Sequence, residues 1–187
     1  MTNWIFIRHG ESTANAANQL SGWQDVRLTT KGQQQAREIG AKLRNINFDL
    51  VVSSDLYRAK ETARLAMEEW SNLTKRQAPI IHTDTQFRER NFLTLQGRNK
   101  SELRASGIME QLTCWDSAPY GIETYNQLLH RVLPSLKRWS IQKNCLLFAH
   151  GGVIRVLTCH FNNHIKAQAG KWKIPNASMI KMRINLK

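Results

Sequence analysis

Two stretches of the chain share one order of residues, WIFIRHG at residues 4–10 and CLLFAHGG at residues 145–152. In each stretch an apolar run that predicts a buried strand ends at a histidine followed by glycine. The carboxyl ends of parallel strands form the ligand crevice of an open α/β sheet, so we expect His9 and His150 to meet there. A glycine after each histidine lets backbone N–H groups approach an anion closely. On spacing alone, two unrelated histidines at strand ends fit equally well.

Short apolar runs alternate with longer helical patterns along the chain, which predicts a three-layer α/β/α sandwich with a mostly parallel central sheet. Residues 83–120 are the least periodic, and we expect an insertion of loops and short helices there, over the active site. The predicted strands are Trp4–Arg8, Leu50–Ser53, Ile80–His82, Cys145–Ala149 and Met179–Ile184. The predicted helices are Gln33–Leu43, Ser54–Trp70, Glu123–Trp139 and Gly151–Phe161.

Composition limits the classes of protein. A chain of 187 residues with 41% hydrophobic and 22% charged residues is typical of one globular domain and argues against disorder. The 27 Lys and Arg against 14 Asp and Glu give a net charge of +13, so the surface attracts anions. Three cysteines without C-x-x-C spacing suggest neither a disulfide framework nor a zinc site. With no apparent signal peptide or membrane span, we expect a single cytoplasmic domain over residues 1–187.

Arg58 adds a third group at the same edge of the sheet. A strand ends just before it and a helix begins, with Ser54 or Asp55 as the expected cap. A helix N-terminus favours anions, and Arg8 and Arg58 can offer planar forks to phosphate oxygens. Two arginines, two histidines and a helix end therefore predict a phosphate pocket without a metal. The alternative for Arg58 is an exposed ion pair with Asp55 or Glu61.

These residues belong to an ordered set that resembles the histidine phosphatase superfamily, also called phosphoglycerate-mutase-like. The resemblance runs from Met1 almost to the C-terminus. The tripeptide Arg-His-Gly alone is weak evidence, whereas the ordered set at family spacing is specific. The set comprises RHGES at residues 8–12, Asn15, SGW at 21–23, LTTKG at 28–32, SSDLYRA at 53–59, AHGGVIR at 149–155 and PNAS at 175–178.

The resemblance implies a mechanism that needs no metal. His9 would attack phosphorus through its neutral imidazole and become a phosphohistidine that water later hydrolyses. Arg8, Arg58 and a protonated His150 would hold the phosphoryl oxygens in the transition state. Glu89 would protonate the leaving group and then act as the base for water.

Glu89 lies in FRERNF at residues 87–92, which resembles the family's acid motif. Its pKa must be raised if it is to donate a proton near neutral pH. We expect Arg88 and Arg90 to point away from it and the bound phosphate to supply the upward shift. The alternative is a surface glutamate paired with those arginines. The family commonly has glycine where this chain has Leu93, so the turn that aims Glu89 is expected to differ.

Further residues match the family by position. Asn15, Ser21 and the Gly151 backbone are expected phosphate contacts, while Glu11 and Glu123 are expected to be structural. Four other histidines match nothing and are expected in ordinary packing or surface positions, namely His82, His130, His160 and His164.

Two activities compete within the resemblance. Arg90 and Lys100 lie in a stretch that looks like the version in cofactor-dependent phosphoglycerate mutases, where they could hold a substrate carboxylate. The region between Lys100 and Glu123 leaves little room for a longer substrate-binding insertion, so the pocket should stay open to water. We therefore expect a cofactor-free phosphatase of small phosphate monoesters, with a phosphorylated metabolite as its partner and a phosphate or sulfate ion able to occupy the pocket.

A basic nucleic-acid-binding domain is the alternative from another class. The charge of +13 and the presence of 6 Trp, 6 Phe and 3 Tyr side chains support it, because aromatic rings can stack on bases. No helix-turn-helix, zinc-finger or RNP motif is apparent in the sequence. Trp4, Trp70 and Trp139 fit core-facing positions better, and a basic surface equally suits an enzyme for anionic substrates.

Overall fold

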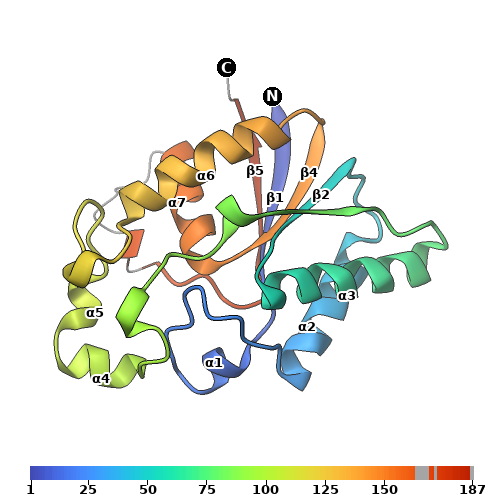
Figure 1. The fold of residues 1–187 in the computed structure, drawn as a ribbon. Helices are drawn as coiled ribbons and strands as arrows, with labels where there is room; N and C mark the ends of the chain where they lie inside the picture. Colours follow the sequence, from blue (N-terminus) through green and yellow to red (C-terminus); the bar gives the residue numbers. More distant parts are fainter. Residues whose placement is uncertain (163–168, 171, 186–187) are drawn as a thin grey trace.

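The computed structural model describes residues 1–162, 169–170 and 172–185. Five strands form one sheet in the order β3-β2-β4-β1-β5 (Figure 1). Four of them pair in parallel, and β5 runs antiparallel to β1 at the edge. The mostly parallel sheet is thus confirmed. The strands are β1 Thr2–Arg8, β2 Leu50–Ser54, β3 Ile81–Asp84, β4 Asn144–Ala149 and β5 Met179–Ile184.

Helices cover both faces of the sheet, with α2 and α3 on one face and α6 and α7 on the other (Figure 1). Successive side chains of a strand point to opposite faces, so β1 contributes to two cores. Trp4 and Phe6 pack with α6 and α7, whereas Ile5 and Ile7 pack with α2 and α3. The expected three layers are confirmed. The covering helices are α2 Thr30–Leu43, α3 Tyr57–Thr74, α6 Tyr125–Trp139 and α7 Gly151–Phe161.

The start of α3 differs from the prediction. The helix begins at Tyr57, because Ser54 completes β2 and the carboxylate of Asp55 is bound to Arg88. Neither residue caps the helix, so that prediction was wrong. Asp25 takes this role from a distant loop, where its carboxylate accepts a hydrogen bond from the Tyr57 N–H at 2.6 Å. The ion pair between Asp55 and Arg88 therefore takes up the carboxylate that the sequence pattern assigns to the cap of the helix.

The predicted insertion is present between β3 and α6. It consists of short helical segments around a small apolar cluster of its own, to which Leu20, Leu103 and Leu112 belong. Figure 1 shows this segment near the short helix α1 (Thr13–Ala16), at the end of the sheet where the parallel strands finish. The segments are η1 Thr85–Phe87, η2 Leu93–Leu95, α4 Lys100–Ala105, α5 Ile108–Gln111 and η3 Pro119–Gly121.

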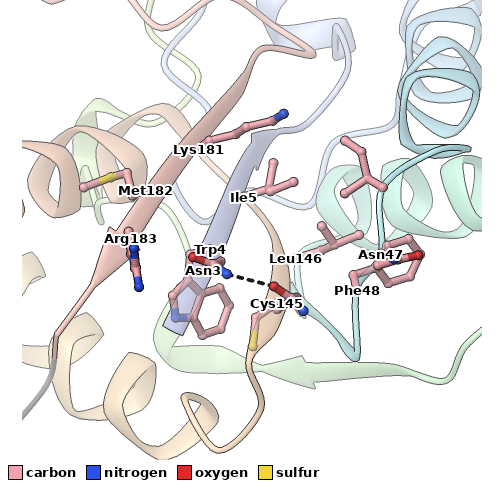
Figure 2. Close-up of a pocket in the computed structure, with 12 residues that line it drawn as sticks. Asn3, Trp4, Ile5, Asn47, Phe48, Cys145, Leu146, Lys181, Met182 and Arg183 are labelled. Carbon is pink, nitrogen blue, oxygen red and sulfur yellow. Dashed lines mark hydrogen bonds between the residues drawn. The ribbon is translucent and has the colours of Figure 1, made fainter. Parts of the chain in front are cut away.

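A cavity of about 300 Å³ lies at the opposite end of the sheet, at the amino ends of β1 and β4 (Figure 2). Ile5 and Leu146 form part of its apolar wall, and Lys181 and Arg183 of β5 border it. Its described lining contains no histidine or carboxylate. Burial raises the pKa of its one thiol, that of Cys145, to about 12, so the thiol is not reactive at neutral pH. We assign no chemistry to this cavity.

Leu93 occupies a backbone conformation that favours glycine, with φ of 43°. A Cβ in the left-handed region costs roughly 1–2 kcal/mol, while glycine costs about 0.5–1 kcal/mol through the entropy of the unfolded chain. We therefore expect Leu93→Gly to be more stable than Leu93→Ala by about 0.5–1 kcal/mol in urea unfolding. Both variants remove the same half-exposed side chain and differ only in the Cβ. An alanine variant of equal or greater stability would contradict the strain assigned to Leu93.

Candidate active site

A cavity of about 570 Å³ opens at the carboxyl ends of β1 and β4. Arg58 and His150 do not line it but lie fully buried against His9, which does. The structure therefore brings the predicted site residues together from distant parts of the chain. Those that line the cavity are Arg8, His9, Asn15, Ser21, Glu89, Arg90, Lys100 and Gly151.

His9 follows the last residue of β1 and is almost fully buried. Its Nδ1 lies 2.7 Å from the Gly10 carbonyl, and since a carbonyl only accepts, Nδ1 carries the proton. Nε2 therefore has a lone pair, toward which Nε of Arg58 donates at 3.2 Å. Burial, followed by the charges of Arg58 and Arg8, lowers the pKa of His9 well below its ordinary value. The imidazole is neutral, as a nitrogen nucleophile must be.

Arg58 is held rigidly at the first turn of α3. Its Nη1 donates to the Gln24 carbonyl at 2.8 Å and its Nη2 to the Gly22 carbonyl at 2.7 Å. Burial lowers its pKa to about 10, so it remains a cation at neutral pH. The alternative of an exposed ion pair is wrong, because Asp55 and Glu61 bind other arginines.

His150 corrects one expectation. It caps α7, its ring lies 5.2 Å from the His9 ring, and its Nε2 lies 2.9 Å from Oγ of Ser54. The resemblance implies a protonated imidazole while the phosphoryl oxygens are held in the transition state. Burial and then the charge of Arg58 instead lower the pKa of His150 well below its ordinary value, so the chain by itself holds it neutral. A phosphate dianion beside it would have to raise that pKa before it could donate two hydrogen bonds.

Nε of Arg8 and Nδ1 of His150, both beside His9, are buried and have no hydrogen-bond partner among the residues that the structure describes. Nη2 of Arg90, which lines the cavity, is a third such atom. The Arg8 guanidinium is fixed by a bond from Nη1 to the Ile174 carbonyl. Buried polar atoms are nearly always bonded, so an unpaired pair beside the nucleophile suits the oxygens of an anion. The first residue of α7, Gly151, adds a helix N-terminus at the same place.

Glu89 is anchored at the first turn of α7. Its carboxylate accepts hydrogen bonds from the Gly152 N–H at 3.0 and 3.2 Å and from the Arg90 N–H at 2.9 Å. As predicted, the guanidinium groups of Arg88 and Arg90 point away from the Glu89 carboxylate. Arg88 binds Asp55, and Arg90 donates to two backbone carbonyls. The alternative of a glutamate paired with those arginines is therefore wrong. A Cβ at residue 152 would stand 2.2 Å from Oε1 of Glu89, so this close approach requires the glycine.

Asn176 is a residue whose role sequence reasoning missed, although its PNAS motif was noted. Its Nδ2 donates to the carbonyls of His9 and Gly10 at 3.1 and 3.3 Å and to Oδ1 of Asn15 at 3.0 Å. It therefore fixes the turn that follows the nucleophile. Gly10 corrects a second expectation, because its N–H donates to Oγ1 of Thr62 at 3.0 Å and is not available to an anion.

The residues predicted to be structural have structural partners. Glu11 binds Lys31 and Glu123 binds Arg131. Trp4 and Trp70 are buried, and Trp139 is partly buried against the core. The side chains of His82, His130 and His160 are exposed, and His164 lies outside the described residues.

The family to which the chain belongs is shown by its similarity to known proteins. Residues 4–187 match the family model of the histidine phosphatase superfamily, branch 1. The chain belongs to the histidine phosphatase superfamily. In the described part of the chain, no group of three or more histidine, cysteine, aspartate and glutamate side chains is arranged to hold a metal ion. None of the helices searched there is long and apolar enough to span a bilayer.

Sequence relatives and structural relatives carry different names. A 2,3-bisphosphoglycerate-dependent phosphoglycerate mutase from Cytophaga hutchinsonii is 34% identical over 83% of this chain and 75% of its own length. One from Methylobacterium radiotolerans is 31% identical over 97% of this chain and 89% of its own. A mycobacterial glucosyl-3-phosphoglycerate phosphatase in complex with VO3 has a TM-score of 0.80 at 25% identity, over 97% of this chain and 92% of that one.

The buried neutral histidines predict how stability depends on pH. Their pKa is lowered in the folded state, so below about 6.5 the unfolded chain takes up protons that the folded chain does not. Stability then falls as pH falls, by up to about 1.4 kcal/mol per pH unit for each histidine. Between pH 7 and 5.5 we expect His9→Gln to lose about 1 kcal/mol less than the unaltered protein in urea unfolding. Equal losses in the two proteins would show that His9 is not held neutral.

Proposed function

We propose that this chain is a metal-independent phosphatase of small phosphate monoesters that works through a phosphohistidine on His9. The observation that carries the proposal is the neutral imidazole of His9, with its Nε2 lone pair beside Arg58, in the same cavity as the anchored carboxyl group of Glu89. A nucleophile and an acid thereby face one cavity, with a fixed cation buried behind the nucleophile. Few reactions other than phosphoryl transfer need this combination.

In the first half-reaction, the hydrogen bond from Nε of Arg58 to Nε2 of His9 breaks and that N–H turns to a phosphoryl oxygen. The freed lone pair of Nε2 forms a bond to phosphorus while the bond from phosphorus to the ester oxygen breaks. The electron pair of that bond stays on the leaving oxygen, which takes a proton from the carboxyl group of Glu89 and departs as an alcohol. The arriving dianion favours the protonated carboxyl group by like-charge repulsion. The products are a phosphohistidine and a Glu89 carboxylate.

In the second half-reaction, the Glu89 carboxylate takes a proton from water as the water oxygen bonds to phosphorus. The bond from phosphorus to Nε2 breaks, and its electron pair returns to the imidazole. Inorganic phosphate leaves, and His9 and protonated Glu89 are restored. The bond from Nδ1 to the Gly10 carbonyl keeps the His9 ring oriented through both halves.

The phosphoryl oxygens would be held by Arg8, Arg58, His150 and the Gly151 N–H. Nε of Arg8 and Nδ1 of His150, the two unpaired nitrogen atoms beside His9, suit this task. Charge redistributes among the three equatorial oxygens in the transition state, and fixed donors stabilise it without reorganising. Asn15 and Ser21 line the same cavity as further contacts.

Hydrolysis is favoured over transfer to a second substrate by the shape of the insertion. Between α4 and α6 it forms only the four residues of α5 and the three of η3 as helix. Lys173 and Pro175 line the cavity and are exposed, and we expect water to enter on this side and reach a phosphohistidine. A mutase must instead keep that intermediate dry until the phosphoryl group is passed on. The similarity to a phosphatase that binds VO3 supports the same choice.

A phosphoglycerate mutase is the second candidate, because the relatives of higher sequence identity carry that name. Arg90 and Lys100 line the cavity and could hold a substrate carboxylate. Arg90 donates to the carbonyls of Glu123 and Leu112 through Nε and Nη1, while its buried Nη2 has no partner among the described residues, so both Arg90 and Lys100 could contact a carboxylate. Burial lowers the pKa of Lys100, as expected for an ammonium group that faces a cavity rather than bulk water.

The two candidates separate in one assay series. We expect the purified protein to release phosphate from a panel of alkyl and aryl phosphate monoesters without added metal and in the presence of a chelator. His9→Ala should lower the rate at least about 10³-fold, since both half-reactions depend on the nucleophile. The parallel measurement is isomerisation of 3-phosphoglycerate in the presence of 2,3-bisphosphoglycerate.

Isomerisation without phosphate release would make the mutase the correct assignment. Release that disappears with chelator would contradict a metal-independent reaction. Absence of both activities would overturn the enzymatic proposal and direct attention to the basic surface.

A further inference from the structure

Trp23 belongs to the SGW motif but takes no part in the reaction proposed above. Its ring is about one-third exposed, at the edge of the active-site cavity formed by the neighbouring residues Ser21 and Gly22. Its indole Nε1–H donates to the backbone carbonyl of Glu89 at 2.6 Å. An exposed tryptophan therefore makes a direct bond to the main chain of the proposed acid.

The ring of Trp23 is held in place by two cations. The guanidinium carbons of Arg88 and Arg131 lie 5.1 and 5.8 Å from its centre, within the range of a cation–π interaction. Each arginine is fixed in turn by a carboxylate, Arg88 by Asp55 and Arg131 by Glu123. These ion pairs anchor the ring to the start of α3 and to α6, so the indole N–H has a defined direction.

Arg131 contacts the same carbonyl as the tryptophan. Its Nη2 donates to the Glu89 carbonyl at 2.8 Å, so that this oxygen accepts two hydrogen bonds. The carboxylate of Glu89 is bound separately, by the N–H of Gly152. Main chain and side chain of the proposed acid are thus fixed by different parts of the fold.

The loop that carries Trp23 also holds the proposed phosphate-binding arginine. The carbonyls on either side of Trp23, those of Gly22 and Gln24, are the acceptors for Arg58. One short loop therefore sets both the cation beside the nucleophile and the backbone of Glu89. A fixed spacing between these two groups is what an in-line displacement needs, because the leaving oxygen departs opposite the attacking nitrogen.

We propose that Trp23 is a positioning residue that places Glu89 for protonation of the leaving group. This inference rests on the proposed phosphatase function. The tryptophan combines a flat face for two cations with an edge N–H for the carbonyl, which phenylalanine lacks. Loss of Trp23 should lower the rate of phosphoryl transfer from substrates whose leaving group needs a proton. The rate should stay nearly unchanged for substrates whose leaving group does not need one.

The test is Trp23→Phe, which keeps a ring for the arginines and removes the N–H. The readout is kcat/KM, which reports transfer to His9, for an alkyl phosphate and for 2,4-dinitrophenyl phosphate. An alkoxide must be protonated as it leaves, whereas dinitrophenolate is stable without a proton. We expect a loss of roughly tenfold for the alkyl phosphate, since misplacing a catalytic group costs rate steeply, and less than about twofold for the aryl ester.

Two further variants make the result specific. Trp139→Phe removes an indole N–H hydrogen bond of similar length, 2.8 Å to Asp84, away from the cavity, and should leave the ratio of the two kcat/KM values unchanged. Arg131→Met keeps a side chain of similar length, removes the second donor to the Glu89 carbonyl and should produce the same selective loss. It keeps the proposal testable should Trp23→Phe fail to fold, as judged by circular dichroism.

A double variant tests whether Trp23 acts through Glu89. Trp23→Phe added to Glu89→Gln should cause no further loss with the alkyl phosphate, because the group being positioned can no longer donate a proton. Equal losses on both substrates, no loss on either, or multiplicative losses in the double variant would overturn the role of Trp23. Absence of His9-dependent hydrolysis of the aryl ester in the unaltered protein would instead overturn the phosphatase proposal itself, and the inference with it.

Discussion

The buried contact between Arg58 and His9 is the constraint on which the site depends. A guanidinium cation lies 3.2 Å from a neutral imidazole, and its fork is completed by the carbonyls of Gly22 and Gln24. Burying a charge is costly unless it is fully hydrogen-bonded, so the loop at residues 21–25 has to close over α3 in one conformation. That same loop supplies the cap of α3 through Asp25 and the indole bond to Glu89. One electrostatic requirement therefore organises the proposed nucleophile His9, its cation and the proposed acid.

Much of this arrangement could be predicted from sequence, for a definite reason. His9 and His150 directly follow apolar runs, and parallel strands bring such ends together, so the sequence locates β1, β4 and α7 closely. Predictions that depended on distant partners were less successful. The cap of α3 was misplaced because Asp55 binds Arg88, and His150 was expected to be charged because its burial is a property of the whole fold. A local sequence pattern locates a helix or strand along the chain. The hydrogen-bond partners and the burial of a side chain can be read only from the folded structure.

Trp23 and Asn176, which hold backbone carbonyls at the site, illustrate the same limit of prediction from sequence. Trp23 acts on a carbonyl 66 positions away, and Asn176 on one 167 positions away. Their partners are backbone oxygens, which every residue carries, so no pairing of side-chain types marks them in a sequence. The choice between a hydrolase and a mutase is likewise not marked by the side chains around His9. Both need the groups around His9, and the outcome depends on whether the insertion at residues 85–121 admits water to the intermediate.

The proposed reaction depends on His9 as the residue that carries the phosphoryl group. The direct measurement is to mix Glu89→Gln protein with 2,4-dinitrophenyl phosphate, quench in alkali, and locate the phosphoryl group by peptide mass spectrometry. Transfer from this substrate needs no acid, whereas hydrolysis of the intermediate needs the base, so the phosphohistidine should accumulate. We expect one alkali-stable, acid-labile phosphoryl group on His9. Phosphorylation of another residue, or none while phosphate is still released, would contradict it.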